Sequence, residues 1–312
     1  MTGETAMRIG VQLGMHGHSG SQELAAPRWE DMRRQAEAAE AAGFDLLVLE
    51  DALVSGGLGT HGYWEAMTLA GAVAASTASI GIGHSMVNPP LRSPAVVAQA
   101  AATLDEISGG RYVLGIGAGN TPEDYETFGI AADHRYSRAA EAIEIVHGLV
   151  RAGAVHLDGR FHAVHGSVEP RGPRSSGPPI VVGARGPRMM RLVARFADQW
   201  NAWTPDAQTV AAFRPMVEEL ERACEDVGRD PTTLGRTLDV AVDPHALLGE
   251  EPTWISDFLI SGSAVEIADG LCAFGAIGID EVRCMVWPDR PAASRPAIIE
   301  ALADVVELVH AG

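Results

Sequence analysis

Segments patterned as strands alternate with segments patterned as helices along the whole chain. Short apolar runs, such as residues 45–50 and 111–117, are each followed by an alanine-rich stretch of helical length. Such alternation predicts a parallel sheet, because each helix returns the chain to the start of the next strand. About eight such units in 312 residues favour an α/β fold closed into a (β/α)8 TIM barrel over an open sheet.

Two stretches fall outside this repeat. Residues 120–134 are expected to form a long loop after the fourth strand. Residues 152–178 contain an expected β-hairpin at 155–164, with a two-residue turn at Asp158-Gly159, and a linker rich in Pro, Gly and Arg. We expect both as insertions at the rim of one barrel, so that residues 1–312 form a single domain. The eight expected strands are residues 8–13, 45–50, 79–83, 111–117, 179–183, 198–203, 237–242 and 281–287.

The composition narrows the class of partner. A net charge of −18 and a pI near 4.9 argue against binding to nucleic acid or to an anionic membrane surface, since both require basic patches. Three cysteines without a CxxC pair argue against a disulfide scaffold and a structural zinc site. No basic-then-apolar leader and no apolar run of membrane-spanning length is visible. We therefore expect a cytoplasmic protein with a small-molecule substrate.

Polar residues gather where the third strand runs into its helix, in the segment 79–94. Ile80 and Ile82 alternate with glycines, as in a buried barrel strand, and His84, Ser85 and Asn88 follow at its C-terminal end. In a barrel of this kind the chemistry lies at the C-terminal ends of the strands, which we call the mouth.

Two glycine-rich turns follow later strands. Residues 115–120 (GIGAGN) resemble a dinucleotide motif only weakly, because no helix starts directly after them; the glycines are better explained by close approach of a flat ring. Residues 183–188 (GARGPR) join a strand to a helix beginning near Pro187. Converging backbone N–H groups, the helix dipole and two arginines favour a phosphate site there over an ordinary turn.

Acid–base candidates also follow strands. Asp51 either caps a loop or acts at the mouth as a cofactor ligand or acid/base, and the sequence leaves both open. His16 and His84 follow the first and third strands, and His61 lies in a long loop; without HxH or HExxH spacing they predict no metal site. His162 and His165 lie on the expected hairpin and are interpreted as surface residues.

Four segments, taken in order, resemble the bacterial-luciferase-like oxidoreductases that use flavin or deazaflavin. They are 43–51 (GFDLLVLED), 92–120 (RSPAVVAQAAATLDEISGGRYVLGIGAGN), 179–188 (PIVVGARGPR) and 197–201 (ADQWN). The resemblance implies a TIM barrel that binds FMN or coenzyme F420 at its mouth. The stretch 86–89 (MVNP) is similar to the deazaflavin-using reductases and favours F420, with FMN as the alternative.

The resemblance also implies roles for individual residues. A non-proline cis peptide between Ser85 and Met86 would lie behind the cofactor ring. His16, Asp51 or His84 would handle the proton that accompanies hydride transfer. The cofactor-binding residues implied are Asp51, Ser85, Met86, Val87, Asn88, Gly117, Ala118, Gly119, Asn120, Gly183, Ala184, Arg185, Gly186, Pro187 and Arg188.

Departures from the family pattern limit the reaction. Sugar-phosphate dehydrogenases of the family carry an Asp-His pair and a Glu where this chain has Asp51-Ala52 and Asn120, so sugar-phosphate oxidation is not expected. The leading hypothesis is hydride transfer between F420 and a small organic substrate. The alternatives are an FMN-dependent monooxygenase that uses oxygen, and a barrel that binds a ligand without turnover. We expect a homodimer whose rim loops 55–63 and 120–134 select the substrate.

Overall fold

Eight parallel strands close into a barrel in the computed structural model, which describes residues 6–15, 26–53, 63–119, 122–131, 133–203, 207–250, 258–287 and 294–312. Neighbouring strands pair in the order β1-β2-β3-β4-β7-β8-β9-β11, and β11 pairs with β1 to complete the circle. The strands are β1 (Arg8–Gln12), β2 (Leu46–Leu49), β3 (Gly81–His84), β4 (Tyr112–Ile116), β7 (Ile180–Gly183), β8 (Gln199–Ala202), β9 (Gly235–Asp243) and β11 (Glu281–Val286). Each of the eight predicted strands is present, and the barrel prediction is confirmed.

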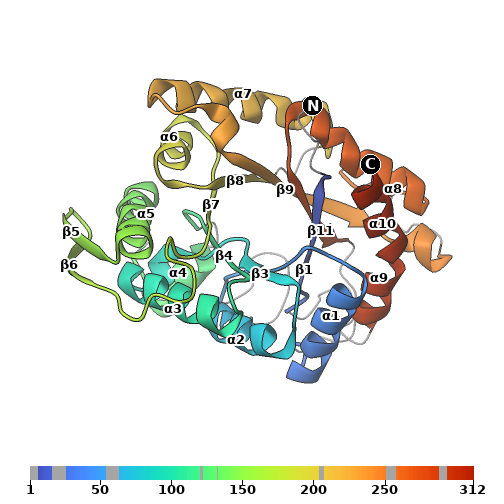
Figure 1. Cartoon of the computed structure of the whole chain (residues 1–312), viewed down its shortest axis with the longest axis horizontal. Coiled ribbons are helices and arrows are strands. Elements are labelled where there is room, and N and C mark those ends of the chain that lie inside the picture. The colour runs from blue at the N-terminus through green and yellow to red at the C-terminus, as the bar shows by residue number, and fades with distance from the viewer. Residues whose placement is uncertain are drawn as a thin grey trace.

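Helices surround the strands as an outer ring (Figure 1). They are α1 (Trp29–Ala41), α2 (Ala66–Ser76), α3 (Pro94–Ile107), α4 (Pro122–Phe128), α5 (Arg135–Ala152), α6 (Pro187–Phe196), α7 (Val210–Asp226), α8 (Ala264–Cys272), α9 (Arg295–Ala301) and α10 (Ala303–Ala311). A short strand, β10 (Ile260–Ser261), extends the end of β9. The first helix, α1, packs against α9 near the end of the chain, and this contact closes the ring of helices.

Side chains alternate between the helix layer and the barrel interior. On β1, Ile9 and Val11 are fully buried in the core cluster that the helices complete. Between them, a Cβ at Gly10 would instead meet the side chain of Arg283 from β11. Burying one aliphatic side chain of this size contributes about 1.5–3 kcal/mol, so the layer between strands and helices supplies most of the stabilisation. The interior holds apolar side chains such as Leu46 together with polar ones such as Arg283.

Both insertions differ in detail from expectation. Residues 120–134 are not only a loop, because they include α4. The hairpin is present as β5 (Ala154–Asp158) and β6 (Ala163–Ser167), but Asp158 pairs with Ala163, so its turn has four residues rather than two. The longer turn is held from α5, where the Glu141 carboxylate accepts hydrogen bonds from three successive N–H groups, those of residues 160–162.

The cysteines and the helix compositions bear on two of the expectations from the sequence. Cys224, Cys272 and Cys284 are free thiols, and burial raises the pKa of Cys284 to about 12. Within the described residues, none of the helices combines the length and apolar composition that crossing a bilayer requires.

One carboxylate ties α1 to the start of the third strand. Glu40 Oε1 accepts hydrogen bonds from the N–H groups of residues 78–80 and from the Ser79 hydroxyl. Partial burial disfavours the ionised carboxylate, but these donors outweigh that effect and lower the pKa of Glu40 to about 2.

We expect Glu40→Gln to lower the free energy of unfolding by about 1–2 kcal/mol at pH 7. Because the folded-state pKa lies below the ordinary 4.5, this contribution is present above pH 4.5 and is lost as the pH falls toward 2. Urea unfolding at several pH values should therefore show the gap between wild type and variant shrinking below pH 4.5. Glu37→Gln, which alters an exposed pair with Arg33 on the same helix, is the control and should cost under about 0.5 kcal/mol. A gap that is constant with pH would refute the charged anchor.

Candidate functional site

The segment after β3 folds back onto β4 at the mouth of the barrel. The peptide bond between Ser85 and Met86 is cis, as predicted. Val87 then pairs with β4: its N–H donates to Gly115 O at 2.9 Å, and its carbonyl accepts from Gly117 N at 3.0 Å. Residues 85–87 are thus fixed by main-chain hydrogen bonds between two neighbouring barrel strands.

Glycines on β4 and β7 make room for this segment. A Cβ at Gly115 would overlap the carbonyl oxygen of His84 and lie 2.7 Å from Met86 Sδ, and a Cβ at Gly183 would lie 2.8 Å from Met86 Cγ. The close approach expected at the glycine-rich turn is therefore made by the chain itself, with Met86 filling the space beside these two glycines. A dinucleotide motif is not needed to explain Gly115.

Asp51 holds the same segment from the other side. Its side chain is fully buried, and its carboxylate accepts two hydrogen bonds from the guanidinium of Arg92, at 2.6 and 2.8 Å. It also accepts, at 2.8 Å, the N–H of Asn88, the residue that precedes the short 3-10 turn at Pro89–Leu91. Both carboxylate oxygens are thus engaged by Arg92 and by the backbone of Asn88, an arrangement that holds the loop after β3. The catalytic role and ring contact expected for Asp51 stay predictions.

His84 faces away from the mouth. Its ring lies between β3 and the helix layer, 1% exposed, with Nδ1 2.8 Å from the hydroxyl oxygen of the β4 residue Tyr112. Burial lowers the pKa of His84, which keeps the ring neutral. In a two-residue alternation, Gly83 and Ser85 face the interior and His84 does not. This geometry favours a packing role for His84, and its catalytic role stays a prediction.

Asn88 is buried as well, 3% exposed, and its Oδ1 accepts a hydrogen bond from the Tyr125 hydroxyl at 2.9 Å. Tyr125 belongs to α4, so the insertion after β4 is docked onto the segment that follows β3. A Cβ at Gly119 would collide with the Tyr125 hydroxyl, which explains this glycine by close packing. Asn88 is thus a structural link between two rim segments.

Polar side chains meet across the barrel axis beneath the mouth, and we call Ser85, Asn201, Asp239 and Arg283 the polar floor. The Ser85 hydroxyl donates to Asp239 Oδ2 at 2.6 Å, although β3 and β9 lie on opposite sides of the barrel. Asn201 Nδ2 donates to Asp239 Oδ1 at 3.1 Å. Burial raises the pKa of Asp239, and the Arg283 guanidinium opposes this rise.

Arg283 completes this layer from the strand next to Asp239. It is 1% exposed, and its Nε donates to Glu281 at 2.7 Å, while its two Nη atoms have no hydrogen-bond partner among the described residues. The polar floor was not predicted from the sequence. The available signal was a charged residue at an interior-facing position inside each of two strands, Asp239 in β9 and Arg283 in β11.

The turn from β7 into α6 has the form expected of an anion site. The helix begins at Pro187 as predicted, with Gly186 as N-cap at φ +81°, where glycine is favoured. Among the described residues, no acceptor takes the N–H groups of Arg185, Gly186 and Arg188. The turn is steadied by Trp200, whose Nε1 donates to Ala184 O at 3.0 Å.

The remaining predicted residues divide into two groups. Gly117 and Ala118 follow β4 beside residues 85–87, at the same edge of the barrel as the β7–α6 turn. His16 and Asn120 lie outside the described residues, so their predicted roles stay predictions.

Comparisons with known proteins identify a family and several relatives. Residues 7–254 match the profile of a family described as luciferase-like monooxygenase. A 5,10-methylenetetrahydromethanopterin reductase of Archaeoglobus fulgidus is 34% identical over 171 residues, which are 55% of this chain and 48% of that protein. An F420-dependent hydroxymycolic acid dehydrogenase of Mycobacterium tuberculosis is 33% identical over 232 residues, 72% of this chain and 61% of that protein. The matched parts thus span about half of the first relative and less than two thirds of the second.

Solved structures share the fold at low identity. An F420-dependent secondary alcohol dehydrogenase in complex with an F420-acetone adduct has a TM-score of 0.77 at 18% identity, covering 97% of this chain and 99% of that one. An EDTA monooxygenase from Chelativorans sp. BNC1 also has a TM-score of 0.77 at 18% identity, covering 97% and 93%. At such identity these likenesses concern the fold.

We expect Asp51→Asn to lower the free energy of unfolding by about 2–4 kcal/mol, because it leaves the largely buried Arg92 guanidinium with Glu65 as its one remaining carboxylate partner. Urea unfolding measures the change. Asp133→Asn, which breaks an exposed pair with Arg138, is the control and should lower the stability far less than Asp51→Asn does. Equal losses would mean that the Asp51 anchor is no stronger than a surface ion pair.

Proposed function

The chain belongs to the luciferase-like monooxygenase family, and on that premise we propose that it is an oxidoreductase using coenzyme F420. In this proposal the enzyme transfers hydride between the bound deazaflavin and a small organic substrate at the mouth of the barrel. The observation that carries the proposal is the shared edge formed by the cis segment 85–87, the end of β4 and the open N-terminus of α6.

The names of the relatives support F420 over FMN. The hydroxymycolic acid dehydrogenase is described as F420-dependent, and one of the similar structures contains an F420 adduct. The sequence stretch 86–89 points the same way. FMN remains the second candidate because the family profile carries the monooxygenase description and an EDTA monooxygenase shares the fold.

The phosphate of the coenzyme would lie at the start of α6. Three N–H groups there, those of Arg185, Gly186 and Arg188, have no acceptor within the described part of the chain, and the helix dipole adds partial positive charge. Arg185 and Arg188 are exposed on either side of Gly186, in a chain with a net charge of −18. The Cβ position of Gly186 has no protein atom within 4 Å, so a phosphate oxygen has room to approach the backbone.

The ring would lie against the segment 85–87, and the turn Gly117-Ala118-Gly119 would line its edge. The bound coenzyme would supply the hydride acceptor or donor. The protein orients the ring: residues 85–87 are fixed by the backbone of β4, and Ser85 is fixed from below by Asp239. We assign Ser85 and Asp239 a positioning role, since they restrain the backbone that would face the ring.

His16 is the first candidate for proton transfer, and Asp51 and His84 stay candidates, although their contacts favour structural roles. We further propose that residues 1–312 act as one domain and that the chain forms a homodimer, which sedimentation would test. Substrate choice is assigned to the rim segments 55–63 and 120–134, the second of which carries α4.

Titration of the protein with oxidised F420 and with FMN should show tighter binding of F420, read from quenching of the fluorescence of each cofactor. Bovine serum albumin at the same concentration controls for nonspecific quenching. Tighter binding of FMN, with oxygen consumption once the flavin is reduced, would replace the deazaflavin reductase by the monooxygenase. Saturable binding of neither cofactor would favour the non-catalytic barrel.

We expect Gly186→Val to weaken F420 binding at least tenfold, about 1.4 kcal/mol, by blocking approach to the backbone. Because Gly186 has a positive φ, valine at this position also strains the backbone. The double variant Arg185→Ala/Arg188→Ala is therefore a second test, which should weaken binding while Gly186 is kept. Arg191→Ala, one turn further along α6, is the matched control and should bind as wild type. Wild-type affinity in both test variants would place the phosphate elsewhere.

A further inference from the structure

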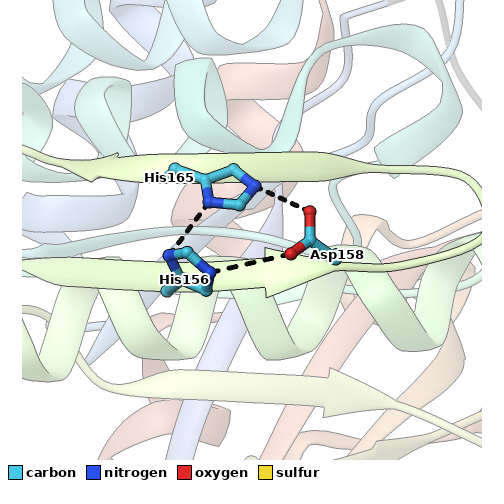
Figure 2. Close-up of side chains that lie close together, drawn as sticks. All are labelled: His156, Asp158 and His165. Carbon is cyan, nitrogen blue, oxygen red and sulfur yellow. Dashed lines mark hydrogen bonds and ion pairs between the residues drawn. The ribbon is translucent and has the colours of Figure 1, made fainter.

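Three metal-ligating side chains converge on the β5–β6 hairpin, outside the ring of helices at the left edge of Figure 1. They are His156 and Asp158 on β5 and His165 on β6. One ligand atom from each residue lies within 4.8 Å of the others, and Figure 2 shows the three side chains turned toward one another. The proposed oxidoreductase function makes no use of this cluster.

The strand register explains why these residues meet. His156 and His165 are directly opposite in the antiparallel pair, and Asp158 is two residues beyond His156, so all three share one face. The other face carries Val155, Leu157 and Val164, which pack on the hydrophobic core. The apolar face therefore fixes the hairpin and directs the two imidazoles and the carboxylate to solvent.

The three groups already interact with one another. Nδ1 of His165 is 2.9 Å from Nδ1 of His156, so the two rings share one hydrogen. Nε2 of His165 is 2.8 Å from Asp158 Oδ1, and Nε2 of His156 is 3.6 Å from Asp158 Oδ2. Ligands bound tetrahedrally to zinc at about 2.0–2.1 Å are about 3.3 Å apart, so small side-chain movements suffice to place a cation among them.

We propose that His156, Asp158 and His165 form a binding site for a divalent transition metal ion, with Zn²⁺ as the ion that its donors fit. Two imidazoles and one carboxylate are donors typical of zinc, and exposure leaves the remaining coordination position to water. The net charge of −18 favours cations generally. A bound ion would cross-link β5 to β6, with the carboxylate supplying one negative charge.

This site departs from the sequence-based expectation of no metal. That expectation rested on His16, His61 and His84, and His165 was interpreted as a surface residue. His156 and Asp158 are two residues apart on β5. His165 comes nine residues after His156, and the two come into contact only because the hairpin register places them opposite each other.

Calorimetric titration of the tag-free, chelator-treated protein with ZnCl₂ tests the proposal. Wild type should bind one equivalent, and His156→Gln and His165→Gln should each weaken binding at least tenfold. Titration with CoCl₂ provides a second readout, since visible absorption bands of bound cobalt should appear in wild type and be lost in the double variant. The substituted side chains are exposed or lie on the solvent face, so the variants should keep the wild-type circular dichroism spectrum.

His162→Gln is the matched control, because His162 lies in the turn of the same hairpin but outside the cluster. It should bind Zn²⁺ as wild type does. No binding by wild type, or equal binding by wild type and the His156→Gln/His165→Gln double variant, would overturn the proposal. The F420 titration is independent of these results, so failure of the metal site and failure of the proposed function can be told apart.

Discussion

The approach of residues 84–87 to β4 is the constraint on which the rest of the mouth depends. Two main-chain hydrogen bonds hold Val87 against Gly115 and Gly117, and they form only because no side chain projects from Gly115. Three further contacts then fix the same segment: Asp51 to the N–H of Asn88, Tyr125 to its side chain, and Asp239 to the Ser85 hydroxyl. Contacts from β4, β9, α4 and the residue Asp51 after β2 thus converge on residues 85–88.

This convergence has a functional meaning in a cofactor-dependent enzyme. A hydride-transferring ring needs one face held by backbone that does not move, and the protein gains rate by orienting the reactants. Buried ion pairs contribute to that rigidity. Arg92 pairs with Asp51 and Glu65, and Arg283 pairs with Glu281. The N–H groups at the start of α6 have no acceptor among the described residues, whereas those of Ser85, Val87 and Asn88 are hydrogen-bonded, as expected if an anion completes the hydrogen bonding at α6.

The fold could be predicted from the sequence because its signals are local. Apolar strands, alanine-rich helices and turn glycines repeat in order, and the start of α6 at Pro187 follows from the same patterns. The resemblance to a family added the cis bond at Ser85–Met86. Side-chain direction could not be predicted equally well: His84 and Asp51 follow strands as expected, yet both face the helix layer.

The contacts that were missed join residues far apart in the chain. Ser85 and Asp239 are separated by 154 positions and meet only when the barrel closes. The hairpin cluster depends in the same way on strand register, and the four-residue turn depends on Glu141 of a neighbouring helix. The periodicity of a strand predicts which of its side chains face the barrel interior. Which residues of other strands they contact there is seen only in the closed barrel.

A crystal structure of the protein grown with F420 would test whether residues 85–87 and the start of α6 bind the coenzyme. We expect electron density for the ring against the backbone of residues 85–87, with the phosphate accepting hydrogen bonds from the N–H groups of Arg185, Gly186 and Arg188. Density for the ring or phosphate at any other part of the barrel would contradict this expectation.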